Sequence, residues 1–85
     1  MVNRVLPDEG FAAAARDYAH RVAAGPTLAH AATKRLVGTA VRDGVRAADD
    51  VTPAVSGSLF GTADLCGAVD SFLREGPGKA TYTGR

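Results

Sequence analysis

Apolar residues in the first third of the chain recur at intervals of four, three and four, the spacing of one face of an α-helix. The stripe consists of Phe11, Ala15, Tyr18 and Val22. Asp8 is a candidate N-cap, because its side chain can accept a hydrogen bond from a backbone N–H of the first turn. Gly25, as a left-handed cap, and Pro26, as a break in the hydrogen-bond ladder, stop the pattern. We therefore predict a helix over residues 8–24.

The residues before this helix have a different pattern. Apolar and β-branched side chains flank Asn3 and Arg4 in residues 2–6, and Pro7 disfavours helical backbone at Leu6. This segment is predicted to be a short strand or an extended lead-in.

A second apolar stripe has a regular spacing of four residues and begins just after Pro26. It consists of Leu28, Ala32, Leu36 and Ala40. Asp43 and Gly44 end the pattern. We expect the first two helices to run antiparallel as an αα-hairpin across Gly25 and Pro26, with small alanine side chains allowing close approach.

The last half of the chain contains two further helical patterns. Pro53 and Gly57 interrupt the first, over residues 45–61, so a bend or break is expected there. Thr62 or Asp64 can cap the last helix, which residues 76–78, Gly-Pro-Gly, end. The apolar face of the last helix consists of Leu65, Val69, Phe72 and Leu73.

These patterns predict an all-α fold: four short helices, with an extended N-terminal lead-in and a C-terminal tail, in one unit spanning residues 1–85. A chain of this size buries only about 60 to 65 per cent of its unfolded surface. Much of the 46% apolar content is alanine, and aromatic residues are only 6%. The core is therefore expected to be thin, and the isolated chain to be oligomeric or partly molten.

Charge and composition exclude several partners. The formal net charge of +1 gives no basic field for nucleic acid, and no apolar run reaches the roughly 18 residues of a membrane span. The single cysteine, Cys66, cannot form an internal disulfide. With no apolar leader pattern, this favours the cytoplasm.

The residues alone predict no catalytic, metal or cofactor site. His20 and His30 lack metal-ligand spacing with Cys66, and no pair of carboxylates is placed for acid–base chemistry. Cys66 is expected to be a small buried hydrophobe rather than a nucleophile. The Gly-Pro-Gly-Lys run at residues 76–79 looks like a phosphate loop, but it follows a helix, so a helix stop is favoured. Tyr82 is expected to be a packing anchor.

Four segments in this order carry a family resemblance: V-N-R-V-L-P-D-E, A-A-G-P-T-L-A-H-A-A-T-K-R-L, L-F-G-T-A-D-L and A-V-D-S-F-L-R-E-G-P-G-K-A-T-Y-T-G-R. The chain resembles, over essentially its whole length, the C-terminal part of the enoyl-CoA hydratase/isomerase family, the crotonase superfamily. The resemblance implies a helical region that covers the acyl pocket and makes oligomer contacts. The family's catalytic core, with its oxyanion hole and carboxylates, is not among these residues.

The resemblance implies a truncated or C-terminal piece that is inactive by itself, with a homo-oligomer or a crotonase-fold core as partner and acyl-CoA bound only in an assembled enzyme. Phe72 matches a family residue that contacts CoA. Glu75 stands where some members have a CoA-contacting lysine, and Lys79 is a candidate to reach a phosphate in its place. The residues also allow an independent helical module that self-associates or docks on a partner. A stand-alone CoA-binding protein is less favoured.

Overall fold

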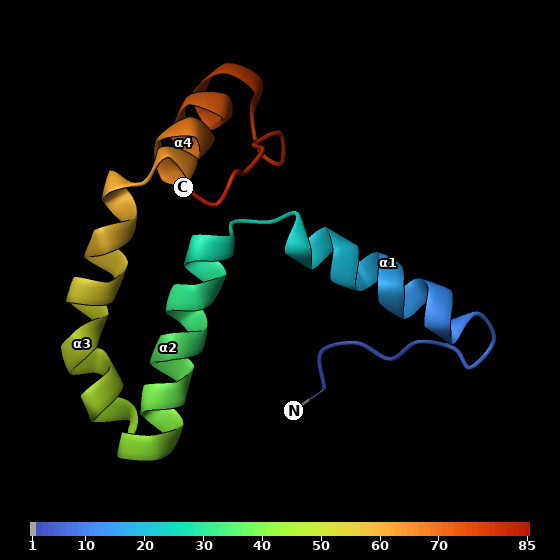
Figure 1. Ribbon diagram of the computed structural model, residues 1–85, viewed down its shortest axis with the longest axis horizontal. Helices are drawn as coiled ribbons and strands as arrows, with labels where there is room; N and C mark the ends of the chain where they lie inside the picture. Colours follow the sequence, from blue (N-terminus) through green and yellow to red (C-terminus); the bar gives the residue numbers. More distant parts are fainter. Residues whose placement is uncertain (1) are drawn as a thin grey trace.

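The computed structural model describes residues 2–85 and consists of helices, with no strand among the described residues (Figure 1). In chain order the elements are α1 (Phe11–Ala23), α2 (Thr27–Asp43), α3 (Val45–Gly57), the 3-10 helix η1 (Ser58–Gly61) and α4 (Ala63–Glu75). The predicted all-α class with four α-helices is confirmed. Residues 2–6 form a lead-in without strand pairing, so the strand alternative is wrong.

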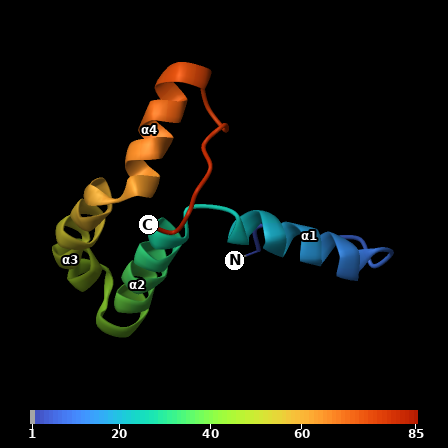
Figure 2. The ribbon, with the colours of Figure 1, turned by 45° about the horizontal axis from the view of Figure 1, so that its top comes forward.

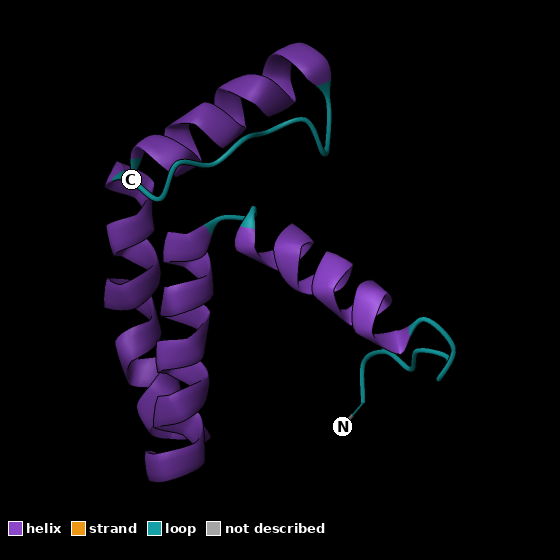
Figure 3. Ribbon diagram, turned by 45° about the vertical axis from the view of Figure 1, so that its right-hand side comes forward, coloured by secondary structure: helices purple, strands orange, loops and turns teal. Residues whose placement is uncertain are grey.

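The hairpin of this fold is formed by α2 and α3, which lie side by side and run antiparallel (Figures 1 and 3). Gly44 alone connects them, with φ 97° and ψ 161°, a conformation that is essentially restricted to glycine. Ala48 and Val55 of α3 are buried, and the predicted stripe of α2 is half-buried. The predicted end of the second helix at Asp43 and Gly44 is confirmed.

The predicted hairpin between the first two helices is wrong, because α1 points away from α2 (Figure 1). Gly25 does not have the positive φ of a left-handed cap, and Ala24 is right-handed. Gly25 instead permits a close approach, since a Cβ there would lie 2.9 Å from Cε1 of His30. The chain therefore leaves α1 without the reversal that an antiparallel pair requires.

The start of α1 also differs from the prediction. Its N-cap is Gly10, left-handed at φ 72°, and the Asp8 side chain makes no cap hydrogen bond. The backbone carbonyl of Asp8 accepts a hydrogen bond from the Phe11 N–H at 3.2 Å, so a turn precedes the helix. The lead-in folds back on α1, where the Arg4 guanidinium carbon lies 5.3 Å from the centroid of the Tyr18 ring.

Of the two interruptions predicted in residues 45–61, the one at Gly57 is confirmed as the end of α3, whereas Pro53 does not end the helix. α3 continues through Pro53, and the backbone changes to the 3-10 form only at Ser58. Thr52 Oγ1 donates to the Ala48 carbonyl at 2.8 Å, and Ser58 Oγ donates to that of Val55 at 2.8 Å. The change of helix type turns the chain toward α4.

The whole molecule is open and flat, with extents of 44 × 39 × 19 Å. Its radius of gyration is 15.9 Å, against about 12 Å for a compact domain of this length. α1 and α4 both leave the same end of the hairpin: α4 extends beyond the end of α3, and α1 extends sideways from the start of α2 (Figure 1). No helix within residues 2–85 is long and apolar enough to cross a membrane.

Candidate functional site

Hydrogen bonds from one side chain join α4 to the tail that follows it, residues 76–85, here called the strap. Thr62 is the N-cap of α4: its Oγ1 accepts a hydrogen bond from the Leu65 N–H at 3.2 Å and donates to the Leu59 carbonyl at 2.6 Å. This confirms Thr62 as the cap. Gly76 ends the helix at φ 83°, and the strap then runs back along α4 (Figure 2).

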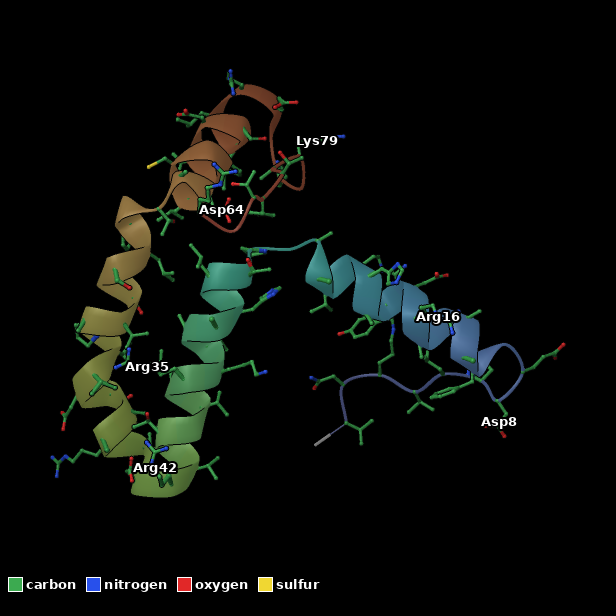
Figure 4. The ribbon with its side chains drawn as sticks, in the orientation of Figure 1. Asp8, Arg16, Arg35, Arg42, Asp64 and Lys79 are labelled. Carbon is green, nitrogen blue, oxygen red and sulfur yellow. The ribbon has the colours of Figure 1, made fainter. Side chains whose placement is uncertain are left out.

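The carboxylate of Asp64 holds the end of the strap (Figure 4). Oδ1 accepts hydrogen bonds from the backbone N–H of Thr83 at 2.7 Å and from its hydroxyl at 3.1 Å, and Oδ2 accepts one from the Gly84 N–H at 2.9 Å. The N–H of Asp64 donates to the Arg85 carbonyl at 2.7 Å. We call these four hydrogen bonds the Asp64 clasp.

The clasp changes the acidity of Asp64. The backbone N–H of Thr83, ahead of the Gly84 N–H and the Thr83 hydroxyl, stabilises the charged form and holds the pKa of this carboxyl below its usual value. Burial acts in the opposite direction, because only 6% of Asp64 is exposed. Asp64 is therefore a buried, fully hydrogen-bonded anion at neutral pH.

The strap covers the less apolar face of α4. Asp64, Ala68 and Ser71 share one face by their spacing and are buried or half-buried, and Ser71 Oγ donates to Glu75 Oε1 at 3.3 Å. The predicted apolar face of α4 is mostly exposed: Leu65 is half-buried, and the other three residues are exposed. These are Val69, Phe72 and Leu73, with 49%, 58% and 75% of their surfaces exposed.

A small apolar pocket of about 160 Å³ lies where the strap meets the hairpin and α4. Its apolar lining includes Leu28 of α2, Leu59 of η1, Leu65 of α4 and Tyr82 of the strap. Tyr82 is half-buried there, in agreement with the predicted packing role. Two shallower pockets between α2 and α3 both include the exposed Arg35.

The two residues that the resemblance implicates in CoA contact are both exposed. Phe72 lies in the last turn of α4, where its carbonyl accepts a hydrogen bond from the Gly76 N–H, and Lys79 follows the turn at Gly78. None of the three pockets above includes Phe72 or Lys79. Their exposure leaves both side chains accessible to a ligand.

Sequence reasoning missed the role of Asp64 as a clasp. It considered Asp64 only as an alternative cap to Thr62, because an acidic residue in a first helical turn is a common local feature. The partner residues Thr83 and Gly84 are 19 and 20 positions away. A Thr-Gly pair at the end of the strap is a weak turn signal, and nothing in the spacing connects it with Asp64.

Other candidate chemistry finds no support in residues 2–85. No group of His, Cys, Asp and Glu there is placed to hold a metal ion. Cys66 is exposed, so its prediction as a buried hydrophobe is wrong; its sulfur lies 4.0 Å from the Phe60 carbonyl oxygen on the outer side of α4. The ion pair between Arg42 and Asp43, at 2.9 Å, is on the surface.

No protein-family model, no curated protein and no solved structure matches this chain.

Proposed function

We propose that this chain is the helical cap and association region of an enoyl-CoA hydratase/isomerase-like protein, without catalytic activity of its own. The observation that carries the proposal is the distribution of apolar side chains: within residues 2–85, Ala48 and Val55 are the buried apolar residues, and thirteen large ones are exposed. Such a surface is stabilised when another protein surface covers it. In the proposed assembly, a crotonase-fold core or neighbouring copies of the chain provide that cover.

The amount of exposed surface supports a large interface. The accessible surface is 6809 Å², about 2,000 Å² more than the roughly 4,700 Å² of a compact protein of 8.7 kDa. Standard interfaces cover about 800 Å² on each partner, and permanent ones cover more. The excess therefore has the size of a permanent interface rather than of a transient contact.

The lineage in this proposal rests on the order of the four motifs, from the lead-in to the strap. Phe72 and Lys79 are the proposed CoA contacts in an assembled enzyme, and their exposure leaves them accessible to a bound nucleotide. Glu75, at the position of the family's lysine, places a negative charge near the same turn, which opposes phosphate binding. We therefore propose that CoA contact depends on Lys79. The cytoplasmic location is part of the same proposal.

A second candidate is an independent self-association module. The observation that favours it is that the α2–α3 hairpin and the Asp64 clasp are formed entirely by residues of this chain. In this case the exposed apolar surface is covered by further copies alone, and CoA has no role.

Complementation separates these two candidates. The chain is mixed with an enoyl-CoA hydratase core that lacks its own C-terminal helical region, and hydration of a 2-enoyl-CoA is followed by the loss of its ultraviolet absorbance. The cap proposal predicts that the mixture gains activity that neither component has, and that Lys79→Ala raises KM for the thioester. Self-association of the chain without any rescue of the core would favour the independent module.

A further inference from the structure

The strap connects two parts of the molecule that otherwise have little contact. α4 packs against η1 and does not lie along the α2–α3 hairpin (Figures 1 and 2). The strap is bound to the start of α4 by the Asp64 clasp, and it also approaches the first residue of α2. A Cβ added at Gly84 would lie 3.2 Å from Thr27 Oγ1.

The apolar pocket is also lined by residues from both parts and from the strap. Leu28 and Ala29 come from α2, Leu65 and Ala68 come from α4, and Tyr82 comes from the strap between them. Tyr82 therefore adds an apolar contact to the polar clasp, and both act at the junction of α4 with the hairpin. Removing the strap would leave this junction supported by η1.

The backbone on either side of α4 is suited to a hinge. Thr62, with φ −84° and ψ 145°, is the single extended residue between η1 and α4. At the other end of α4, Gly76 and Gly78 have φ values of 83° and 78°, so the strap is connected through a glycine turn. A change at Thr62 would rotate α4 and keep the backbone hydrogen bonds inside both helices, but it would break one of the two hydrogen bonds of the Thr62 hydroxyl, to the Leu59 carbonyl or from the Leu65 N–H.

We propose that residues 79–85 form a latch, closed by Asp64, that fixes the orientation of α4 relative to the α2–α3 hairpin. When the latch opens, α4 pivots at Thr62, and the pocket between α2 and α4 opens while the hairpin stays folded. The exposed apolar face of α4, with Phe72 and Leu73, moves with the helix. If this face is covered as in the proposed function, which this step rests on, the latch sets the orientation in which α4 meets the covering surface.

A distance measurement between α4 and α2 tests the latch directly. The native Cys66 is exposed on α4, and Lys34→Cys places a second thiol on the exposed side of α2. Spin labels on the two thiols report the distance between α4 and α2 by double electron–electron resonance. The labelled protein is diluted with an excess of unlabelled chain, so that only distances within one molecule are measured. With the latch closed, we expect one narrow distribution of distances.

Two variants are expected to open the latch, one at Asp64 on α4 and one at Gly84 on the strap. Asp64→Asn removes the charge and turns one acceptor into a donor that faces the Gly84 N–H. Gly84→Ala strains a backbone at φ 77° and crowds Thr27, and leaves α4 unchanged. Each should add a broad, shifted population of distances and lower the exchange protection of the Thr83 and Gly84 amides roughly tenfold or more, as expected when a hydrogen bond to a charged group is lost.

Asp70→Asn is the matched control, because it makes the same chemical change on an exposed residue of the same helix. It should keep the narrow distribution. Far-ultraviolet circular dichroism, read on each variant, should show the helices intact. A narrow, unshifted distribution in both Asp64→Asn and Gly84→Ala would overturn the proposal, and so would loss of helix in both, since the hairpin would then depend on the latch.

Discussion

At the scale of single residues, Asp64 and Gly44 determine where distant parts of the chain meet and where the chain reverses. Asp64 brings together a helix start and a chain end through hydrogen bonds of 2.7 to 3.1 Å, and Gly44 reverses the chain at φ 97°. Gly44 was recognisable in the sequence because glycine after an amphipathic run is a local signal. Asp64 was not, because its partners are distant in sequence and are mostly backbone groups, which every residue type has.

The lowered pKa of Asp64 predicts an acid-dependent opening of the strap. A carboxyl whose pKa is lower in the folded state stabilises that state above its unfolded pKa of about 4, and the contribution is lost as pH falls through the folded pKa. The amide resonances of Thr83 and Gly84 should therefore be constant from pH 8 to 5 and shift only in more acidic solution.

Other titratable groups lie on the elements around Asp64, and Glu75 lies on α4 itself. The strap contributes Lys79, Tyr82 and Arg85, the start of α2 contributes His30, and η1 has no titratable side chain. Within residues 2–85 no ion pair involves Asp64. Asp64→Asn should remove the acid-dependent shift, and a shift that persists in this variant would assign it to another group.

Substituting Gly44 and Gly38 by alanine tests whether the backbone conformation at Gly44 requires glycine. Gly44→Ala should destabilise the hairpin by about 1 to 3 kcal/mol, because alanine is strained at this φ and ψ. Gly38 lies inside α2 with nothing within 4 Å of an added Cβ, so Gly38→Ala should stabilise it by about 0.5 to 1 kcal/mol. Urea unfolding gives both values, and effects of the same sign would contradict the assignment of Gly44 as the reversing residue.

At the scale of elements, amphipathic spacing predicted the helices better than it predicted their partners. The end of α2 at Asp43 and the two ends of α4 follow from local glycine and cap signals, and all agree with the structure. The pairing of the first two helices was wrong, because an apolar stripe says which side of a helix is apolar and not which surface covers it. Three of the four stripe residues of α1 are exposed, Phe11 at 54%, Tyr18 at 45% and Val22 at 44%.

Pro53 offers a test of the continuity of α3. Proline at this position removes a backbone N–H that would otherwise bond to the Asp49 carbonyl four residues earlier. Pro53→Ala should restore that bond and raise the free energy of unfolding by up to about 3 kcal/mol. An unchanged urea midpoint would mean that the helix is already broken at this point in solution.

At the scale of the whole molecule, the chain has secondary structure but almost no interior. The sequence predicted a thin core from its alanine content and its size, and the burial of only Ala48 and Val55 among the apolar residues of 2–85 agrees with this. The open arrangement itself could not be predicted, because amphipathic spacing shows which side of a helix is apolar and not which surface covers it. Our account therefore makes association of the chain its central claim.

Sedimentation velocity across a range of concentrations tests this claim most directly. We predict that the chain associates, that Leu73→Gln on the apolar face of α4 shifts it toward the monomer, and that Arg74→Gln, the same replacement at the neighbouring exposed position, does not. The two variants differ in whether an apolar side chain is lost. A wild-type chain that sediments as a single monomer at all concentrations, with a sharp thermal transition, would contradict the account.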